Sequence, residues 1–297
     1  MLQVAFFGSD SVLSLRAVEA VAAEHRVVGV VQAARRFPQP AIGPVLRTLW
    51  QAQRHFLGRM PLAAWAREGG IPHRFALDRN DPAVAAQLTS WQADIICVVT
   101  YRWILPAALF EVPRLGGVNL HPSLLPRHRG PWPVFWTYYH DDREAGLTVH
   151  RAVERADAGP VLLQQALPLP RGRPVADLYG EFADRAGPLL VRALNALETG
   201  TARPAEQDEG RATRAPRVPA GQSVVPFQEW DVERVWHFIG GLASHYREPL
   251  RDARGRPVRY REAAGYERGT HDRVPGTVER ADGGWRLHAL GGTVQLR

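Results

Sequence analysis

The first thirty residues alternate between short apolar runs and one amphipathic run. Residues 2–8 (LQVAFFG) and 26–32 (RVVGVVQ) are apolar and rich in β-branched side chains, a pattern typical of strands buried on both faces. Between them, residues 12–23 carry apolar side chains at helical spacing, after a turn whose Asp10 or Ser11 can cap a helix. Two buried strands joined by a helix indicate a parallel sheet with right-handed crossovers, which we expect to be doubly wound.

The same alternation continues to about residue 197. Further helices are predicted over residues 61–68, 81–91 and 175–197, and further strands over 71–75, 93–100, 116–121, 147–153 and 161–169. The last two strands should pair as a hairpin or as the edge of a mixed sheet. Residues 33–60 interrupt the pattern, and we interpret them as an insertion at the carboxyl edge of the sheet with a helix over 45–57.

The pattern changes after residue 200. Residues 201–220 are polar, rich in proline and without periodicity, which predicts a linker on the surface. A helix that Asp231 can cap follows, and then four short strands separated by turns over residues 258–263, 274–280, 284–290 and 292–296. Such strands favour a small β-barrel. We therefore divide the chain into an α/β domain over residues 1–200, a linker over 201–222 and a small β domain over 223–297.

Composition favours a globular protein of a reducing compartment. Hydrophobic residues make up 45% of the 297, and no apolar run approaches the roughly 20 residues that cross a bilayer. The first residues enter a strand pattern without a basic leader, and the single Cys97 excludes an internal disulfide. We expect a cytoplasmic protein with no membrane partner.

The charge of the chain invites a nucleic-acid partner without requiring one. The formal net charge is +7 and the estimated pI about 10.2, yet the chain has no lysine, so all 37 basic residues are arginine. They are scattered mostly singly, as a genome-wide base-composition bias would leave them. Three interpretations of this charge remain open: a surface exposed to solvent, a nucleic-acid partner, or a small phosphorylated or nucleotide-bearing substrate held by arginine.

The turn at Gly8, Ser9 and Asp10 does not predict a dinucleotide site. Binders of NAD follow their first strand with a G-x-G-x-x-G pattern, and the second and third glycines are missing here. We expect this turn to contact a substrate, or nothing.

The candidate chemistry lies in residues 116–133 (GGVNLHPSLLPRHRGPWP). Asn119 and His121 stand two apart at the end of a predicted strand, so both side chains lie on one face. Pro122 and Pro126 restrict the loop that follows and should make it stiff.

Asp157, at the tip of the predicted hairpin, completes a set suited to acyl transfer onto a nucleophile that the substrate brings. Asn119 would donate to the oxyanion, His121 would stabilise the oxyanion or move protons, and Asp157 would orient the imidazole and accept a proton. We expect Ser123 to hold backbone groups rather than attack. The alternative is that all three residues only form turns. His121 and His128 are the only nearby pair of histidines, with no Cys or Glu at ligand spacing, so no metal site is predicted.

Four motifs resemble one enzyme family. The sequences NLHPSLLP at 119–126, RG at 129–130, TVH at 148–150 and RADAG at 155–159 are similar to those of formyltransferases that use 10-formyltetrahydrofolate. The resemblance is dense over residues 2–197. It implies a doubly wound, Rossmann-like formyltransferase domain followed by a small OB-like β-barrel domain.

The resemblance also implies site residues. The catalytic Asn, His and Asp of the family fall on Asn119, His121 and Asp157. The co-substrate 10-formyltetrahydrofolate would be bound, largely through backbone groups, at Tyr101, Ile104, Leu105, Val153 and Asp157. The acceptor would enter beside Gly8, Ser9 and Asp10.

The acceptor is less determined than the chemistry. The turn at residues 8–11 and the insertion at 33–60 depart from the methionyl-tRNA formyltransferase pattern, which favours a small-molecule amine such as a nucleotide-linked amino sugar or a precursor of a specialised metabolite. Methionyl-tRNA is the alternative, so a tRNA partner stays open. A 10-formyltetrahydrofolate hydrolase is a further alternative. The sequence leaves the oligomeric state undetermined.

Overall fold

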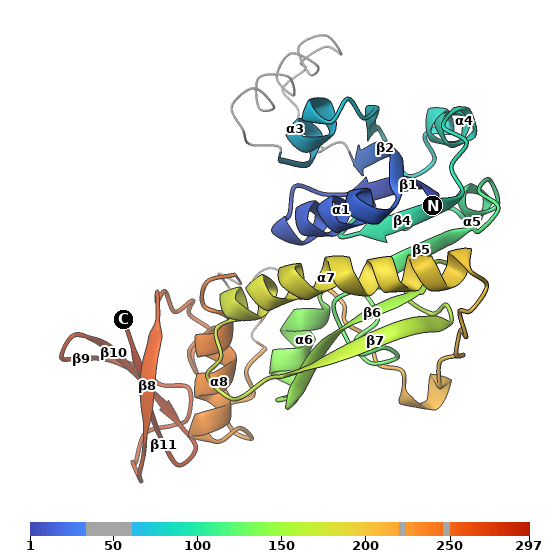
Figure 1. Cartoon of the computed structure of the whole chain (residues 1–297). Helices are drawn as coiled ribbons and strands as arrows, with labels where there is room; N and C mark the ends of the chain where they lie inside the picture. The colour runs from blue at the N-terminus through green and yellow to red at the C-terminus, as the bar shows by residue number, and fades with distance from the viewer. Residues whose placement is uncertain (34–60, 220–221, 223, 246–249) are drawn as a thin grey trace. The chain divides into compact units, whose positions relative to one another are not determined.

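A computed structural model describes residues 1–33, 61–219, 222, 224–245 and 250–297 of the chain (Figure 1). The helix predicted over 45–57 lies outside these residues. Contacts between Cα atoms divide the chain into two compact units. The first comprises residues 1–129, 146–165 and 182–212, and the second comprises 130–145, 166–181 and 213–297. Residues 201–212 of the predicted linker thus group with the α/β core, while the domain boundaries proposed above stay a prediction.

A seven-stranded sheet holds the parallel strands that the sequence predicts. Its strands are β1 (Gln3–Gly8), β2 (Arg26–Ala33), β3 (His73–Ala76), β4 (Ile95–Val99), β5 (Gly117–His121), β6 (Glu144–Arg151) and β7 (Val161–Pro168). Their order is β3-β2-β1-β4-β5-β6-β7, and the neighbours from β3 to β5 pair in parallel. The order reverses between β1 and β4, which confirms the doubly wound sheet.

The sheet becomes antiparallel where β6 pairs with β5, which confirms the predicted mixed edge. In the register of this pair Asn119 lies opposite His150 and His121 lies opposite Thr148. Because side chains directly opposite each other share a face, the register places all four on one face of the sheet.

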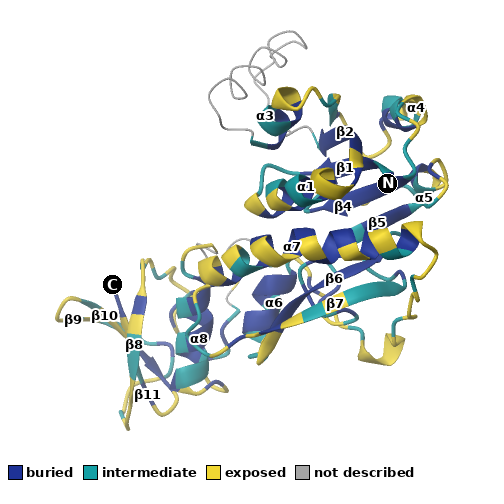
Figure 2. Cartoon of the chain, viewed as in Figure 1, coloured by how far each residue is buried: buried dark blue, intermediate teal, exposed yellow. Residues whose placement is uncertain are grey.

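Helices flank the sheet and bury its apolar side chains. They are α1 (Val12–Glu24), α3 (Pro61–Glu68), α4 (Pro82–Ser90), α5 (Ala107–Phe110) and α7 (Val175–Glu198), whereas α6 (Pro133–Tyr139) belongs to the second unit. On one face Ala5 and Phe7 of β1 pack with Val84 and Leu88 of α4 and Leu109 of α5. Helix α1 contacts β2 and β4, and Gly187 of α7 lies against Ala20 of α1, where a Cβ would not fit. Figure 2 shows β1, β4 and β5 as buried and α7 as alternately buried and exposed.

The C-terminal residues form the small β domain that the sequence predicts. After α8 (Val232–Leu242), capped by Asp231, strands β8 (Ala263–Arg268), β9 (Val278–Ala281), β10 (Gly284–Ala289) and β11 (Gly292–Leu296) form an antiparallel sheet in the order β8-β11-β10-β9. The first of these strands is displaced from its predicted position at 258–263. The chain is still turning at Arg251 and Pro257, which form a bridge, and pairing with β11 begins only at Ala263.

The second unit also buries a histidine. His237 of α8 is fully buried, stacks on Tyr138 of α6 with ring centroids 5.0 Å apart, and accepts a hydrogen bond from the Gly172 backbone through Nδ1. Its Nε2 has no hydrogen-bond partner. Burial lowers the pKa of His237 to about 4, although Asp141 acts in the opposite direction.

Of the helices in the described part of the chain, none combines the length and the apolar character that a bilayer crossing requires.

Candidate active site

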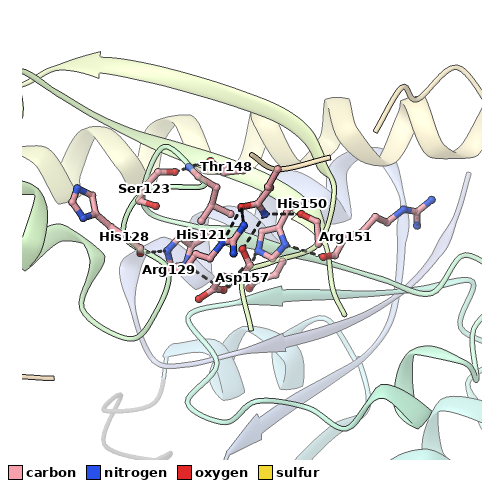
Figure 3. A network of polar contacts seen from close by, with 12 residues as sticks. His121, Ser123, His128, Arg129, Thr148, His150, Arg151 and Asp157 are labelled. Atoms are coloured by element: carbon pink, nitrogen blue, oxygen red, sulfur yellow. Dashed lines mark hydrogen bonds and ion pairs between the residues drawn. The ribbon is translucent and has the colours of Figure 1, made fainter. Parts of the chain in front are cut away.

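The three candidate catalytic residues meet at the end of β5, and Figure 3 shows two of them, His121 and Asp157, close to each other. Asn119 Nδ2 donates a hydrogen bond to Asp157 Oδ1 at 3.3 Å, and His121 Nδ1 lies 3.5 Å from the same oxygen. Asn119 and His121 come from one strand and Asp157 comes from the loop after β6, 36 residues beyond His121 along the chain. A single carboxylate oxygen is thus the common neighbour of the amide and the imidazole.

The orientation of His121 follows from its second nitrogen. Nε2 lies 2.9 Å from the backbone oxygen of His128, which can only accept, so Nε2 carries the proton. In the neutral ring, Nδ1 therefore presents a lone pair toward Asp157. Only 5% of His121 is exposed, and burial lowers its pKa while the Asp157 carboxylate acts to raise it. When Nδ1 is protonated, the positively charged His121 ring forms an ion pair with the Asp157 carboxylate.

His150 is a fourth member of this group, which the sequence analysis had left without a role. Its Nδ1 donates to the Arg151 backbone oxygen at 2.8 Å, so its Nε2 accepts from Asn119 Nδ2 at 3.0 Å. The two hydrogens of the Asn119 amide are then shared between His150 and Asp157. His150 thereby fixes which end of the Asn119 side chain is the donor.

The loop after β5 is held by hydrogen bonds. Ser123 Oγ donates to the Arg127 backbone oxygen at 2.8 Å, which confirms that this hydroxyl holds backbone groups. Thr148 Oγ1 donates to the Ser123 backbone oxygen at 2.6 Å and accepts from the Leu125 backbone at 3.2 Å. Gln164 of β7 adds a hydrogen bond to the Leu125 backbone oxygen at 2.7 Å. The loop therefore depends on side chains of β6 and β7, not only on its prolines.

The residues expected to bind the folate follow β4 and β6. Tyr101 is half-buried and its ring contacts Phe7, with centroids 5.4 Å apart, while burial raises the pKa of its hydroxyl. Leu105 is buried, whereas Ile104 is 56% and Val153 38% exposed. Exposed apolar side chains beside polar backbone suit a flat heterocycle, so these residues fit the group. Their contact with the folate stays a prediction.

The residues expected near the acceptor follow β1, at the reversal of the strand order. Ser9 Oγ is hydrogen-bonded to Thr100 Oγ1 at 2.7 Å, and Asp10 accepts from Gln32 Nε2 at 3.1 Å. A Cβ at Gly8 would lie 2.7 Å from the Phe6 ring. Ligands of doubly wound sheets bind at such a reversal, yet the role of this turn stays a prediction. Among the described residues, no three His, Cys, Asp or Glu side chains are grouped to hold a metal ion.

Gln207 is a further residue of the site, which no motif in the sequence indicates. It lies in the segment interpreted as a linker, but its amide donates to the backbone oxygen of Asp157 at 2.9 Å. No signal in the sequence marks this contact, because residues 201–212 have no periodicity and Gln207 is 50 residues from Asp157.

The arrangement can stabilise negative charge on an oxygen and accept a proton nearby. The Asn119 amide and a protonated His121 are donors, and Asp157 is a base within reach of both. Attack of a neutral amine on an acyl carbon needs these functions, and no side chain of the protein needs to be the nucleophile.

Comparison with known proteins supports this chemistry. The family model described as formyl transferase matches residues 57–194, which include the three candidate catalytic residues. A methionyl-tRNA formyltransferase of Deinococcus radiodurans is 38% identical over 218 residues, covering 72% of this chain and 63% of that protein. The methionyl-tRNA formyltransferase of Trichlorobacter lovleyi is 31% identical over 219 residues, covering 73% of this chain and 67% of that protein. The chain thus spans about two thirds or less of the lengths of these relatives.

The fold agrees with the sequence relatives. The structure of an N-formyltransferase of Helicobacter canadensis, solved with folinic acid and dTDP-3-aminofucose, matches 100% of this chain and 98% of its own with a TM-score of 0.69 and 12% identity. At that identity the match speaks for the fold alone. The family model, the sequence relatives and the fold agree, and the chain belongs to the formyl transferase family.

Proposed function

We propose that this protein transfers a formyl group from 10-formyltetrahydrofolate to a primary amine. The observation that carries the proposal is the convergence of the Asn119 amide and the His121 imidazole on one oxygen of Asp157. The folate supplies an activated formyl group and a leaving nitrogen. Everything else in the reaction is a task of binding, charge stabilisation and proton transfer, for which the site has side chains.

Each side chain has one task in this mechanism. Asn119 and His121 donate to the formyl oxygen as negative charge develops on it, and one such donor contributes roughly 3 kcal/mol. His121 donates through a proton at Nδ1, because its Nε2 is bound to the His128 backbone oxygen. Asp157, directly or through a water molecule, accepts the proton that the attacking amine must lose. Because Asp157 also lies beside His121, its charge favours the protonated ring when that ring donates.

The resting hydrogen bonds must change during the reaction. The two amide hydrogens of Asn119 are shared between His150 and Asp157, so donation to a formyl oxygen requires one of these bonds to be given up. The contact with Asp157 is the longer of the two, at 3.3 Å against 3.0 Å, and it is the one whose loss frees the carboxylate for the amine proton. We expect His150 to keep its hydrogen bond and hold the amide in place.

Two acceptor classes are supported by different observations. The relatives with 31–41% identity are methionyl-tRNA formyltransferases, which supports methionyl-tRNA as the acceptor, and we place it first. The turn at Gly8, Ser9 and Asp10 supports the small-molecule amine that the sequence analysis favours.

The test follows release of tetrahydrofolate by absorbance, with and without a panel of amines that includes methionyl-tRNA and nucleotide-linked amino sugars. Release that depends on one amine would support transfer and identify the acceptor class. Release without any amine would indicate the hydrolase, and no release under any condition would remove the proposal.

A further inference from the structure

Gln207 joins the two loops that carry the candidate catalytic groups. Its Nε2 donates to the backbone oxygens of Asp157 at 2.9 Å and Gly159 at 2.7 Å. Its Oε1 accepts from Arg129, at 3.0 Å from Nε and 2.7 Å from Nη2. A primary amide has two hydrogens and one oxygen with two lone pairs, so these four contacts use the whole hydrogen-bonding capacity of the side chain.

On one side, Gln207 binds Arg129, which follows the residue whose backbone oxygen orients the His121 ring. Arg129 is 2% exposed, and its guanidinium is neutralised by Glu209, whose carboxylate lies 2.9 Å from Nη2. A buried guanidinium is costly to leave without partners, so the Gln207 and Glu209 contacts fix the chain at Arg129. The residue before it is His128, whose backbone oxygen orients the His121 ring through Nε2 at 2.9 Å.

On the other side the contact holds the Asp157 turn. Asp157 has φ of +55°, in the left-handed region that residues other than glycine seldom adopt. A Cβ at Gly159 would overlap the Arg151 backbone oxygen, so the turn packs tightly against the end of β6. The Gln207 amide binds the backbone oxygens of both residues, and so supports a backbone conformation that local preference alone does not favour.

We propose that Gln207 is a positioning residue for formyl transfer, because it ties the loop that anchors His121 to the loop that carries Asp157 and so sets the separation of ring and carboxylate. The inference rests on the proposed function. It assigns to residues 201–212 a part in the chemistry, beyond connecting two domains.

Two variants of similar size distinguish the hydrogen bonds to Arg129 from those to the Asp157 and Gly159 backbone oxygens. Gln207→Glu keeps an oxygen for Arg129 but replaces the donor with an oxygen that repels the Asp157 and Gly159 carbonyls. Gln207→Met keeps the length of the side chain and removes every hydrogen bond. The matched control is Glu206→Gln, at the exposed neighbouring position.

Two measurements are made on each folded variant. With the amine that supports tetrahydrofolate release in the assay above, kcat should fall about 10- to 100-fold for Gln207→Glu and Gln207→Met, the cost of a misplacement of order 1 Å. It should stay unchanged for Glu206→Gln. Independently of turnover, the His121 ring is titrated by NMR, with His128 and His150 assigned because they also face it. If Asp157 moves away from the ring, His121 should titrate at lower pH in both Gln207 variants.

The outcomes distinguish the two proposals. Wild-type kcat together with an unchanged His121 titration in both variants would overturn the role of Gln207. This holds even if the melting temperature falls, because Gln207 would then only stabilise the fold. If the wild-type protein transfers no formyl group, the proposed function fails, and the NMR titration alone still decides whether Gln207 positions Asp157.

Discussion

Asp157→Asn tests the central claim about the site. The substitution preserves the size of the side chain and an oxygen that can accept from Asn119, but it removes the negative charge and the basic oxygen. Folding should therefore be affected little, while both roles assigned to Asp157 are lost.

The structure sets the size of the expected effect. A full charge on Asp157 Oδ1, 3.5 Å from His121 Nδ1, attracts a protonated ring by about 5 kcal/mol at an effective dielectric constant of about 20. If only about 3 kcal/mol of this acts in the transition state, kcat falls roughly a hundredfold. Loss of the proton acceptor adds to this, so we expect a decrease of about a hundredfold or more.

The assay is amine-dependent release of tetrahydrofolate, at saturating concentrations of both substrates. Asp184→Asn, an exposed position on α7, controls for the change of charge and should leave kcat unaltered. A folded Asp157→Asn variant with near-normal turnover would refute the roles assigned here to the carboxylate.

Four further substitutions test other parts of the structure. Asn119→Ala removes an oxyanion donor and should lower kcat roughly a hundredfold, with KM for the folate little changed, as steady-state kinetics would show. Gly159→Ala should lower both kcat and melting temperature, because its Cβ would overlap the Arg151 backbone oxygen, whereas Gly180→Ala on α7, with open space around it, should stabilise the fold by about 0.5–1 kcal/mol. The pKa of His237, lowered by burial to about 4, predicts that stability is complete above pH 6.5 and is lost as pH falls through 6.5 to 4, by about 3 kcal/mol. His237→Gln should flatten that part of the pH dependence in denaturant titrations, and an unchanged slope would contradict the assignment.

Local pattern was enough to predict the sheet. Buried parallel strands are continuous apolar runs, and residues 4–8 and 95–99 keep that character from end to end. The strand predicted over 258–263 was wrong because its place is decided by the partner strand. Pairing with β11 starts only at Ala263, and no local preference of residues 258–262 records that.

The site was predictable where its residues are close in sequence. Asn119 and His121 share a face because they are two apart on one strand. Asp157 is distant in sequence, and its place beside them was expected from its position at the tip of the predicted hairpin. His150 could not be assigned in the same way, because its contact with Asn119 depends on the register of two strands that the sequence does not specify. Gln207 acts across 50 residues from a segment whose sequence has no periodicity, so only the folded chain reveals it.

Because β5 pairs with β6, this site depends on the number of residues in the two strands more than on the identity of their apolar side chains. Two successive pairs lie on one face of the sheet, Asn119 opposite His150 and His121 opposite Thr148. Both pairs therefore depend on the same strand register. Deleting one residue from β6 would turn His150 and Thr148 to the opposite face together. Asn119 would then lose the hydrogen bond to His150, and the loop after β5 would lose its hydrogen bonds to Thr148. Insertions and deletions in these two strands should therefore be far less tolerated than substitutions among their apolar positions.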